Sequence, residues 1–168
     1  MNSYALTQIV AISSSFWLSA RDTKHVNKTG EIFTYSWGAV PAVLTAIPTS
    51  PHLAAKQWAA FYHKGHSLGP PFAILGAGGF IWLALKSHCS LYWGAAILNI
   101  AIVPWTILFM LQTNNKIFEF ANMKDSSENT PRDGARLTSL INKWASLNTV
   151  RSLFPLAGGI FGLLAALG

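Results

Sequence analysis

Residues 91–112 read LYWGAAILNIAIVPWTILFMLQ and contain no charged side chain. A helix needs about 20 predominantly apolar residues to cross the hydrocarbon core of a bilayer, so this stretch predicts a transmembrane helix. Two further stretches have the same character, PPFAILGAGGFIWLALK at 70–86 and LNTVRSLFPLAGGIFGLLAALG at 147–168. Together the three predict an all-α protein, an integral membrane helical bundle.

The composition of the whole chain agrees with this interpretation. Hydrophobic residues make up 51% of the chain and charged residues 11%, whereas soluble proteins carry about 25% charged residues. The formal net charge is +6, but the Lys and Arg residues lie between the apolar stretches and form no single cluster. That distribution fits cations beside anionic lipid headgroups. We therefore expect a lipid bilayer as the partner, and no nucleic acid.

Two weaker apolar stretches lie nearer the N-terminus, at residues 4–20 and 31–48, on either side of the polar sequence RDTKHVNKTG at 21–30. Both contain several polar side chains, so the pattern leaves open whether each crosses the bilayer. If one of them crosses, the bundle has four transmembrane helices. If both cross, it has five.

Residues 52–65 predict a short amphipathic helix at the membrane interface, because their apolar and aromatic positions recur with helical spacing. We expect Gly69, Pro70 and Pro71 to end this helix and to redirect the chain. The polar sequence at about 113–146 predicts a loop. The length of the chain favours one domain over residues 1–168.

Small residues on two apolar stretches predict closely packed helices. They are Gly76, Gly78 and Gly79 in the first stretch and Gly158, Gly159 and Gly162 in the last. Packing within one chain is the favoured interpretation, since a helical bundle must bury some helix faces. The alternative is a homo-oligomer held together through the same faces.

The sequence WAAFYHKGHSLGPP at 58–71 contains the first group of candidate functional residues. Trp58, Tyr62 and His66 recur every four residues and so share one face of a helix. A neutral imidazole accepts a proton near neutral pH, which makes His66 or His63 a candidate catalytic base. The alternative is a belt of aromatic rings at the level of the lipid headgroups.

A metal site is a weaker interpretation of the same region. His52, His63 and His66 could hold copper or iron only if all three converge, and no carboxylate accompanies them. The single Cys89 excludes a metal site built from several cysteines. We therefore expect no metal.

The second group comprises Trp144, Asn148 and Arg151, which lie on one face where the last apolar stretch begins. An Arg guanidinium in such a place could bind a carboxylate, phenolate or enolate oxygen. Alternatively, it reaches back to the membrane surface. Asn99 lies inside another apolar stretch and needs a hydrogen-bond partner from a neighbouring helix.

Three motifs resemble those of the fungal anthrone oxygenase family: WAAFYHKGHSLGPP (58–71), VPWTILFMLQTNNKIFEF (103–120) and WASLNTVRSLFPLAGGIFG (144–162). The sequence SWGAVPAVL (36–44) also fits the first helix of that family. The polar sequence at 21–30 departs from the family, because relatives have what looks like one long first helix there.

The resemblance implies a small membrane enzyme that oxidises an anthrone to an anthraquinone with O2 and with no cofactor. Family positions carried over to this chain include Tyr62, Gly65, Pro70, Thr106 and Asn114. On this hypothesis His66 or His63 is the base, and Arg151 with Asn148 stabilises the enolate. The substrate, a hydrophobic aromatic molecule, would be bound by Trp58, Tyr62, Trp105, Asn114 and Trp144.

Two alternatives to an oxygenase remain open at this point. One is a cyclase or isomerase of a natural-product pathway that uses the same pocket for acid–base catalysis alone. The other is a non-catalytic membrane protein. For the oxygenase and for both alternatives we expect the protein in the endoplasmic reticulum or another endomembrane.

Overall fold

The computed structural model describes residues 3–19, 34–123 and 130–168, and every regular element in these ranges is a helix. The elements, in chain order, are α1 (Ser3–Ser19), the π-helix η1 (Tyr35–Ala39), α3 (Val40–Ala46), α4 (Pro51–Ser87), α5 (Ser90–Trp105), the π-helix η2 (Thr106–Met110), α6 (Leu111–Asn122) and α7 (Pro131–Leu167). The prediction of an all-α fold is therefore confirmed for this part of the chain. The polar sequence at 21–30 lies outside the described residues.

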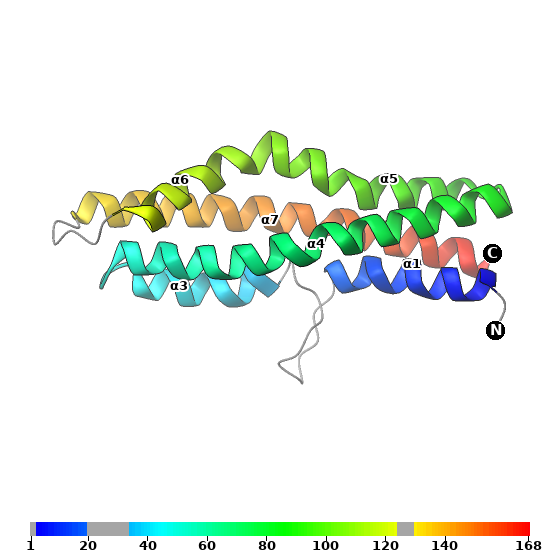
Figure 1. The fold of residues 1–168 in the computed structure, drawn as a ribbon, viewed down its shortest axis with the longest axis horizontal. Coiled ribbons are helices and arrows are strands. Elements are labelled where there is room, and N and C mark those ends of the chain that lie inside the picture. Colours follow the sequence, from blue (N-terminus) through cyan, green and yellow to red (C-terminus); the bar gives the residue numbers. More distant parts are fainter. Residues whose placement is uncertain (1–2, 20–33, 124–129) are drawn as a thin grey trace.

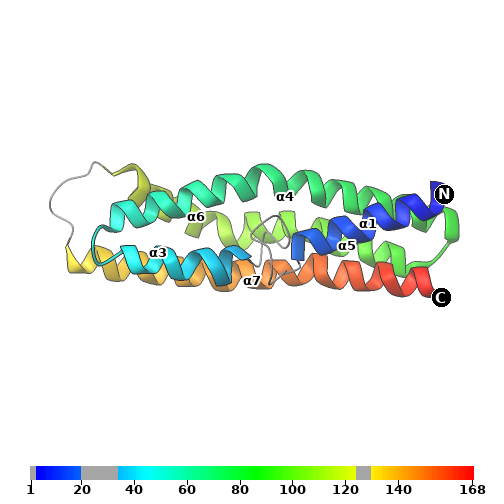
Figure 2. The same ribbon diagram turned by 90° about the horizontal axis from the view of Figure 1, so that it is seen from below.

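The helices form one elongated bundle (Figure 1). Helices α4 and α7 run along its whole length, and the continuous chain α5–η2–α6 runs beside them. The remaining side is shared by two short segments placed end to end. Helix α1 packs on α4 and α7 in one half of the bundle, and α3 packs on the same two helices in the other half (Figure 2).

Helix α4 runs without interruption from Pro51 to Ser87, with Pro70 and Pro71 inside it. The predicted break at Gly69–Pro71 is therefore wrong, and the predicted interfacial helix at 52–65 is the first part of α4. Proline removes a backbone donor and crowds the preceding turn, but both prolines are exposed, Pro70 in the wall of an open cavity. Buried residues before and after them, from Trp58 to Phe80, keep the two halves aligned in the bundle.

The polar sequence at 113–146, predicted to be a loop, is mostly helical, because α6 extends to Asn122 and α7 begins at Pro131. The start of α7 has a capping box. The Thr130 hydroxyl accepts from the Asp133 backbone N–H at 3.3 Å, and the Asp133 carboxylate accepts from the Thr130 backbone N–H at 3.3 Å. This local signal starts the helix some four turns before its apolar part.

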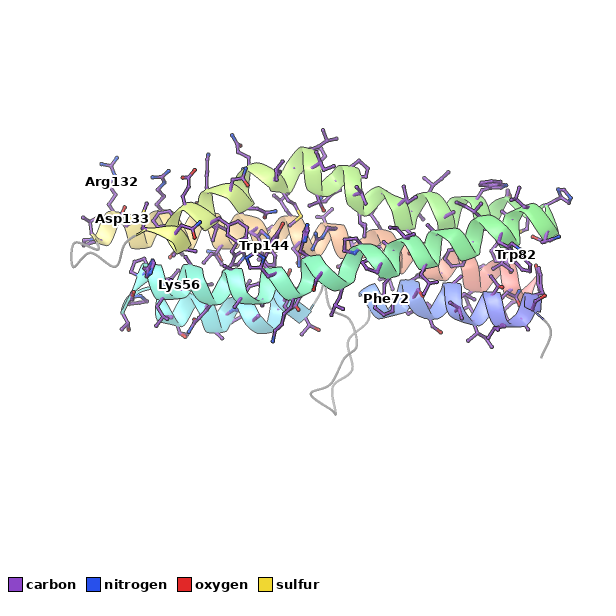
Figure 3. The ribbon with its side chains drawn as sticks, in the orientation of Figure 1. Lys56, Phe72, Trp82, Arg132, Asp133 and Trp144 are labelled. Atoms are coloured by element: carbon purple, nitrogen blue, oxygen red, sulfur yellow. The ribbon has the colours of Figure 1, made fainter. Side chains whose placement is uncertain are left out.

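Among the described residues, three helices are long and apolar enough to cross a membrane: Pro51–Ser87, Ser90–Asn122 and Pro131–Leu167. Each of them contains one of the three strongest predicted spans. Helix α1 has 17 residues, and α3 with η1 is shorter still. Figure 3 shows Lys56, Arg132 and Asp133 near one end of the bundle and Trp82 near the other.

Asn99 is fully buried between three helices. Its Oδ1 accepts a hydrogen bond of 3.0 Å from Ser15 of α1, and its Nδ2 donates to the Ala95 carbonyl at 2.9 Å. Glycines make room for this amide: a Cβ at Gly158 would stand 2.5 Å from Asn99 Nδ2, and one at Gly76 would stand 3.2 Å from Oδ1. The expected partner from a neighbouring helix is thus present, and these two glycines pack within the chain.

Candidate functional site

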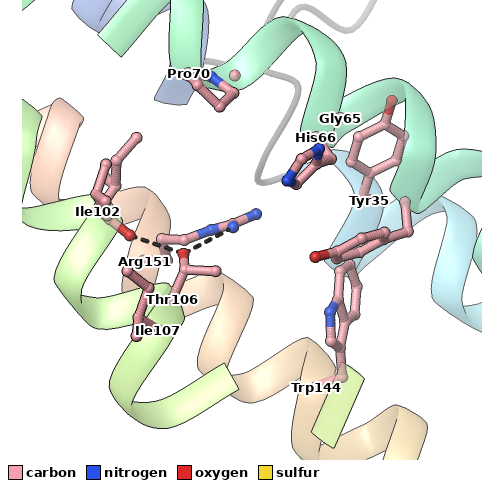
Figure 4. Close-up of a pocket in the computed structure, with 12 residues that line it drawn as sticks. Tyr35, Gly65, His66, Pro70, Ile102, Thr106, Ile107, Trp144 and Arg151 are labelled. Carbon is pink, nitrogen blue, oxygen red and sulfur yellow. Dashed lines mark hydrogen bonds between the residues drawn. The ribbon is translucent and has the colours of Figure 1, made fainter. Parts of the chain in front are cut away.

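A cavity of about 260 Å³ lies midway along the bundle (Figure 4). Residues from η1, α4, α5, η2 and α7 line it: Tyr35, Tyr62, Gly65, His66, Gly69, Pro70, Ile102, Val103, Thr106, Ile107, Trp144 and Arg151. Most of the wall is apolar or aromatic. The described lining contains one permanent cation, Arg151, and no carboxylate.

Both π-helical turns found among the described residues contribute to this cavity. Tyr35 is the first residue of η1, and Thr106 and Ile107 begin η2 directly after the α5 segment that contains Pro104. A π turn carries one residue more than an α-helical turn and is frequent at functional sites. At η2 the helix also bows away from α4 and α7 (Figure 1). The two π-helical turns, η1 and η2, therefore border the cavity.

Hydrogen bonds to η2 and to the preceding turn of α7 hold Arg151 in place. One terminal nitrogen donates to Thr106 Oγ1 at 3.2 Å (Figure 4). The other donates to Asn148 Oδ1 at 2.5 Å. Thr106 in turn donates its hydroxyl proton to the Ile102 carbonyl at 2.7 Å. The guanidinium is thereby preorganised beside the cavity, as a group that stabilises a developing oxyanion must be.

Asn148 is fully buried and does not line the cavity. Its Nδ2 donates to Ser36 Oγ at 2.9 Å, and the Ser36 hydroxyl donates to the Ala145 carbonyl at 3.2 Å. Because the Nδ2 of Asn148 is directed to Ser36, its Oδ1 faces Arg151. Asn148 is therefore placed to orient Arg151 and not to touch a ligand.

Trp58, Tyr62 and His66 share one face of α4, as their four-residue spacing predicts, and in the structure their rings form a stacked series. The Trp58 and Tyr62 rings stack at 4.9 Å, and the Tyr62 and His66 rings stack at 5.9 Å. Trp58 also makes an edge contact of 5.6 Å with Trp144 of α7. Of these four side chains, Trp58 is the only one outside the cavity lining, so it supports Tyr62 and Trp144 from behind.

Polar atoms on this aromatic side are partly unsatisfied. Asn114 Nδ2 donates to the Tyr62 hydroxyl at 3.1 Å, but Asn114 Oδ1 and the indole nitrogens of Trp58 and Trp144 are buried without a hydrogen-bond partner among the described residues. Figure 4 shows the Trp144 nitrogen on the side of its ring that faces Arg151. A buried donor without a partner is costly, so a ligand oxygen would be stabilised here.

The structure brings four predicted site residues to the cavity lining: Tyr62, His66, Trp144 and Arg151. Asn114 and Asn148 do not line the cavity but are hydrogen-bonded to residues that do, Asn114 to Tyr62 and Asn148 to Arg151. Trp105, predicted to bind substrate, is not in the lining, because its Nε1 donates to the Leu147 carbonyl at 3.2 Å and its ring packs on Phe154.

The candidate bases His63 and His66 are placed differently. Both are exposed, but His66 lines the cavity, whereas His63 does not and its ring lies against Phe118 at 5.3 Å. His52 is remote from both, about 16 Å along the helix from His63 at 1.5 Å per residue, and its Nδ1 is hydrogen-bonded to the Phe120 carbonyl. The three histidines therefore do not converge, and the described residues contain no group of three potential metal-binding side chains.

Tyr35 and Ser36 were not predicted as site residues. Tyr35 lines the cavity and stacks on Phe61 at 5.1 Å, and Ser36 completes the hydrogen bonds behind Arg151. The available signal was weak: polar side chains within an otherwise apolar stretch. The spacing of residues along one helix gives no information on which helix lies opposite.

The chain is similar to known oxygenases. The family model described as anthrone oxygenase matches residues 58–161, a range that includes every cavity residue except Tyr35. An anthrone oxygenase of Aspergillus fumigatus is 33% identical, covering 96% of this chain and 93% of its own length. An anthrone oxygenase of Aspergillus terreus is 35% identical over 78% of this chain and 86% of its own length.

A noranthrone monooxygenase of Aspergillus flavus is 30% identical, covering 83% of this chain and 68% of its own length. No solved structure matches the chain.

Proposed function

Because this chain belongs to the anthrone oxygenase family and is an oxygenase, we propose that it oxidises an anthrone-like aromatic polyketide to the corresponding quinone with O2. The observation that carries the proposal is the cavity itself: an apolar, aromatic space with one preorganised guanidinium and one imidazole in its wall. Such a space suits a flat, rigid tricycle with a few oxygen atoms. Its volume of about 260 Å³ is close to the lower limit for small-molecule pockets.

The first step is removal of a proton from the CH2 group of the anthrone. His66 is the base in this proposal, because its ring lines the cavity and His63 does not. The electrons of the broken C–H bond move to the carbonyl oxygen and form an enolate. Arg151 stabilises that oxygen, and its bonds to Thr106 and Asn148 keep the guanidinium in position before the charge develops.

The second step is reaction of the enolate with O2. The enolate carbon passes one electron to O2, and the resulting radical and superoxide combine to form a C–O bond. Protonation gives a hydroperoxide at that carbon. Loss of the second C–H proton breaks the O–O bond, which leaves the quinone carbonyl and one water molecule. The overall reaction consumes one O2 and needs no further reductant.

O2 is the co-substrate in this scheme, and the steps use only groups of the chain and the two substrates. Copper or iron at the histidines remains the alternative, although His52, His63 and His66 lie apart. Metal analysis of the purified protein and assays with a chelator distinguish the two. Full activity in metal-free protein is expected.

The proposed setting is a lipid bilayer, with the endoplasmic reticulum or another endomembrane as location. The three long apolar helices support it, as do large exposed apolar side chains such as Ile74, Ile97 and Leu108, which are 66%, 66% and 73% exposed. Helix α1 and the η1–α3 segment, placed end to end, would supply the fourth side of the bundle within the membrane. An apolar tricycle dissolves in lipid and would reach the cavity from there.

The test is turnover of 1,8-dihydroxyanthrone by the purified protein in lipid vesicles, with O2 consumption and quinone formation recorded together. We expect one O2 consumed per quinone and no product under argon. Because anthrones oxidise slowly in air, protein-free vesicles give the background rate to subtract. Conversion without O2 consumption would favour the cyclase or isomerase, and absence of turnover with hydroxylated anthrones would contradict the proposed activity.

A further inference from the structure

Tyr62 lines the cavity, and its hydrogen bond with Asn114 indicates a role for its hydroxyl group. Asn114 Nδ2 donates to the Tyr62 oxygen at 3.1 Å, so this oxygen acts as an acceptor. In the described part of the chain no residue accepts the Tyr62 hydroxyl proton. A phenol can accept and donate at once, and the donor function of this one is left for whatever occupies the cavity.

The other neighbours of Tyr62 suit a proton donor. His66 stacks on its ring at 5.9 Å and lines the same cavity, and Trp58 supports its other face at 4.9 Å. In Figure 4, His66 and Trp144 lie across the cavity from Arg151. In a tricyclic anthrone the carbon that becomes oxygenated lies opposite the carbonyl group, across the central ring. If the carbonyl oxygen binds Arg151, that carbon therefore points toward His66 and Trp144.

We propose that Tyr62 donates the proton that converts the substrate peroxide anion to the hydroperoxide, and that His66 then restores the proton to Tyr62. This assignment rests on the proposed oxygenase function and adds a specific proton donor to it. Asn114 acts as a positioning residue, since its amide fixes the Tyr62 oxygen and leaves the hydroxyl proton directed into the cavity.

The proton balance closes with these two side chains. His66 takes the first C–H proton and becomes positively charged. After O2 has added, Tyr62 gives its proton to the terminal peroxide oxygen, and the charged His66 returns one to the phenolate. Neutral His66 then removes the second C–H proton as the O–O bond breaks. The departing hydroxide takes that proton and leaves as water.

The main test is Tyr62→Phe, which keeps the ring and removes only the hydroxyl. With 1,8-dihydroxyanthrone in lipid vesicles we expect kcat to fall about 100-fold, the usual size of a general-acid contribution, with KM changed less than about threefold. Because the peroxide is not protonated, we also expect superoxide or hydrogen peroxide to be released instead of quinone. A purely structural role would not change how the consumed O2 is divided between quinone and peroxide.

The matched control is Tyr92→Phe. Tyr92 is buried, whereas Tyr62 is half-buried. The Tyr92 hydroxyl also accepts an amide hydrogen bond, from Gln8 at 2.8 Å, but Tyr92 does not line the cavity. We expect wild-type turnover and no peroxide release from this variant. Wild-type quinone formation by Tyr62→Phe would overturn the assignment of Tyr62 while leaving the oxygenase proposal intact.

Asn114→Ala keeps the proposal testable if Tyr62→Phe does not fold. This variant retains the phenol but removes the amide that fixes its oxygen, so we expect a smaller loss of kcat, about tenfold, with partial release of peroxide. A higher rate than wild type would mean that the amide held the phenol proton away from the cavity, and would overturn the assignment. Absence of O2 consumption by the wild-type protein would instead contradict the proposed function itself.

Discussion

The ring of Tyr35 lies against the backbone of α4 at Gly65, where a Cβ atom would stand 2.8 Å from Tyr35 Cε2. Both residues line the cavity. The missing side chain at position 65 therefore sets how closely η1 approaches α4. The size of the cavity depends on this contact, which joins two segments far apart in the sequence.

Gly65→Ala should displace the Tyr35 ring, because real Cβ atoms do not approach another carbon at 2.8 Å. We expect weaker substrate binding, seen as a KM raised by about tenfold, or about 1.4 kcal/mol of binding free energy. Steady-state kinetics with a hydroxylated anthrone measures it. Gly78→Ala is the matched control, because a Cβ at Gly78 of the same helix meets nothing within 4 Å. An unchanged KM in Gly65→Ala would contradict the role of this contact.

Arg151→Ala should lower kcat by about 100- to 1000-fold, the loss found when one donor to an oxyanion is removed. Arg151→Lys should recover part of the rate, since it keeps the charge but loses the fork that bonds both Thr106 and Asn148. Arg136→Ala serves as the control, because that guanidinium lies over the Phe120 ring at the polar start of α7. Near-wild-type rates in Arg151→Ala would exclude it as the enolate-stabilising group.

His66→Ala should lower kcat by about 100-fold, and His63→Ala should change it less than about twofold. The reason is placement: only His66 of this pair is in the cavity lining. Rates for both variants, measured over a range of pH, separate the two. If His63→Ala were the impaired variant, the base would have to be reassigned and the cavity would not be the site of proton removal.

Gly158→Ala should destabilise the protein with little direct effect on the chemistry. A Cβ there would stand 2.5 Å from Asn99 Nδ2, and the buried amide cannot move without losing its bond to Ser15. We expect the free energy of unfolding to fall by about 1–3 kcal/mol. Thermal unfolding in detergent measures the change, with Gly78→Ala again as the reference. Equal stability of the two variants would mean that the amide can be accommodated elsewhere.

Features that depend on neighbouring turns of one helix could be predicted from the sequence. The shared face of Trp144, Asn148 and Arg151 and the stacked series Trp58–Tyr62–His66 follow from helical spacing alone, and the structure confirms them as neighbours. The need of Asn99 for a partner on another helix follows from its place in an apolar stretch, and Ser15 supplies it.

Features that depend on contacts between helices could not be predicted in this way. Nothing local indicates that Ser36 meets Asn148 or that Tyr35 meets Gly65. The double proline at 70–71 predicts a helix end, whereas α4 continues through it because the residues before and after it are buried in the bundle. The Thr130–Asp133 capping box is a local sequence signal for the start of α7 at Pro131. The polar composition of residues 113–146 predicts a loop instead, and that prediction is wrong.

The π turn η2 has a consequence for how such a chain tolerates insertions and deletions. Residues 106–110 contain one residue more than a continuous α-helix would need. Deleting one of them would remove the bulge and leave an even α-helix, so the residues after it would keep their faces and Asn114 would still meet Tyr62. Deleting a residue from an α-helical turn before Asn114 would instead rotate everything after it by about 100° and turn Asn114 away from Tyr62. A one-residue deletion is therefore better tolerated at η2 than in the α-helical turns beside it.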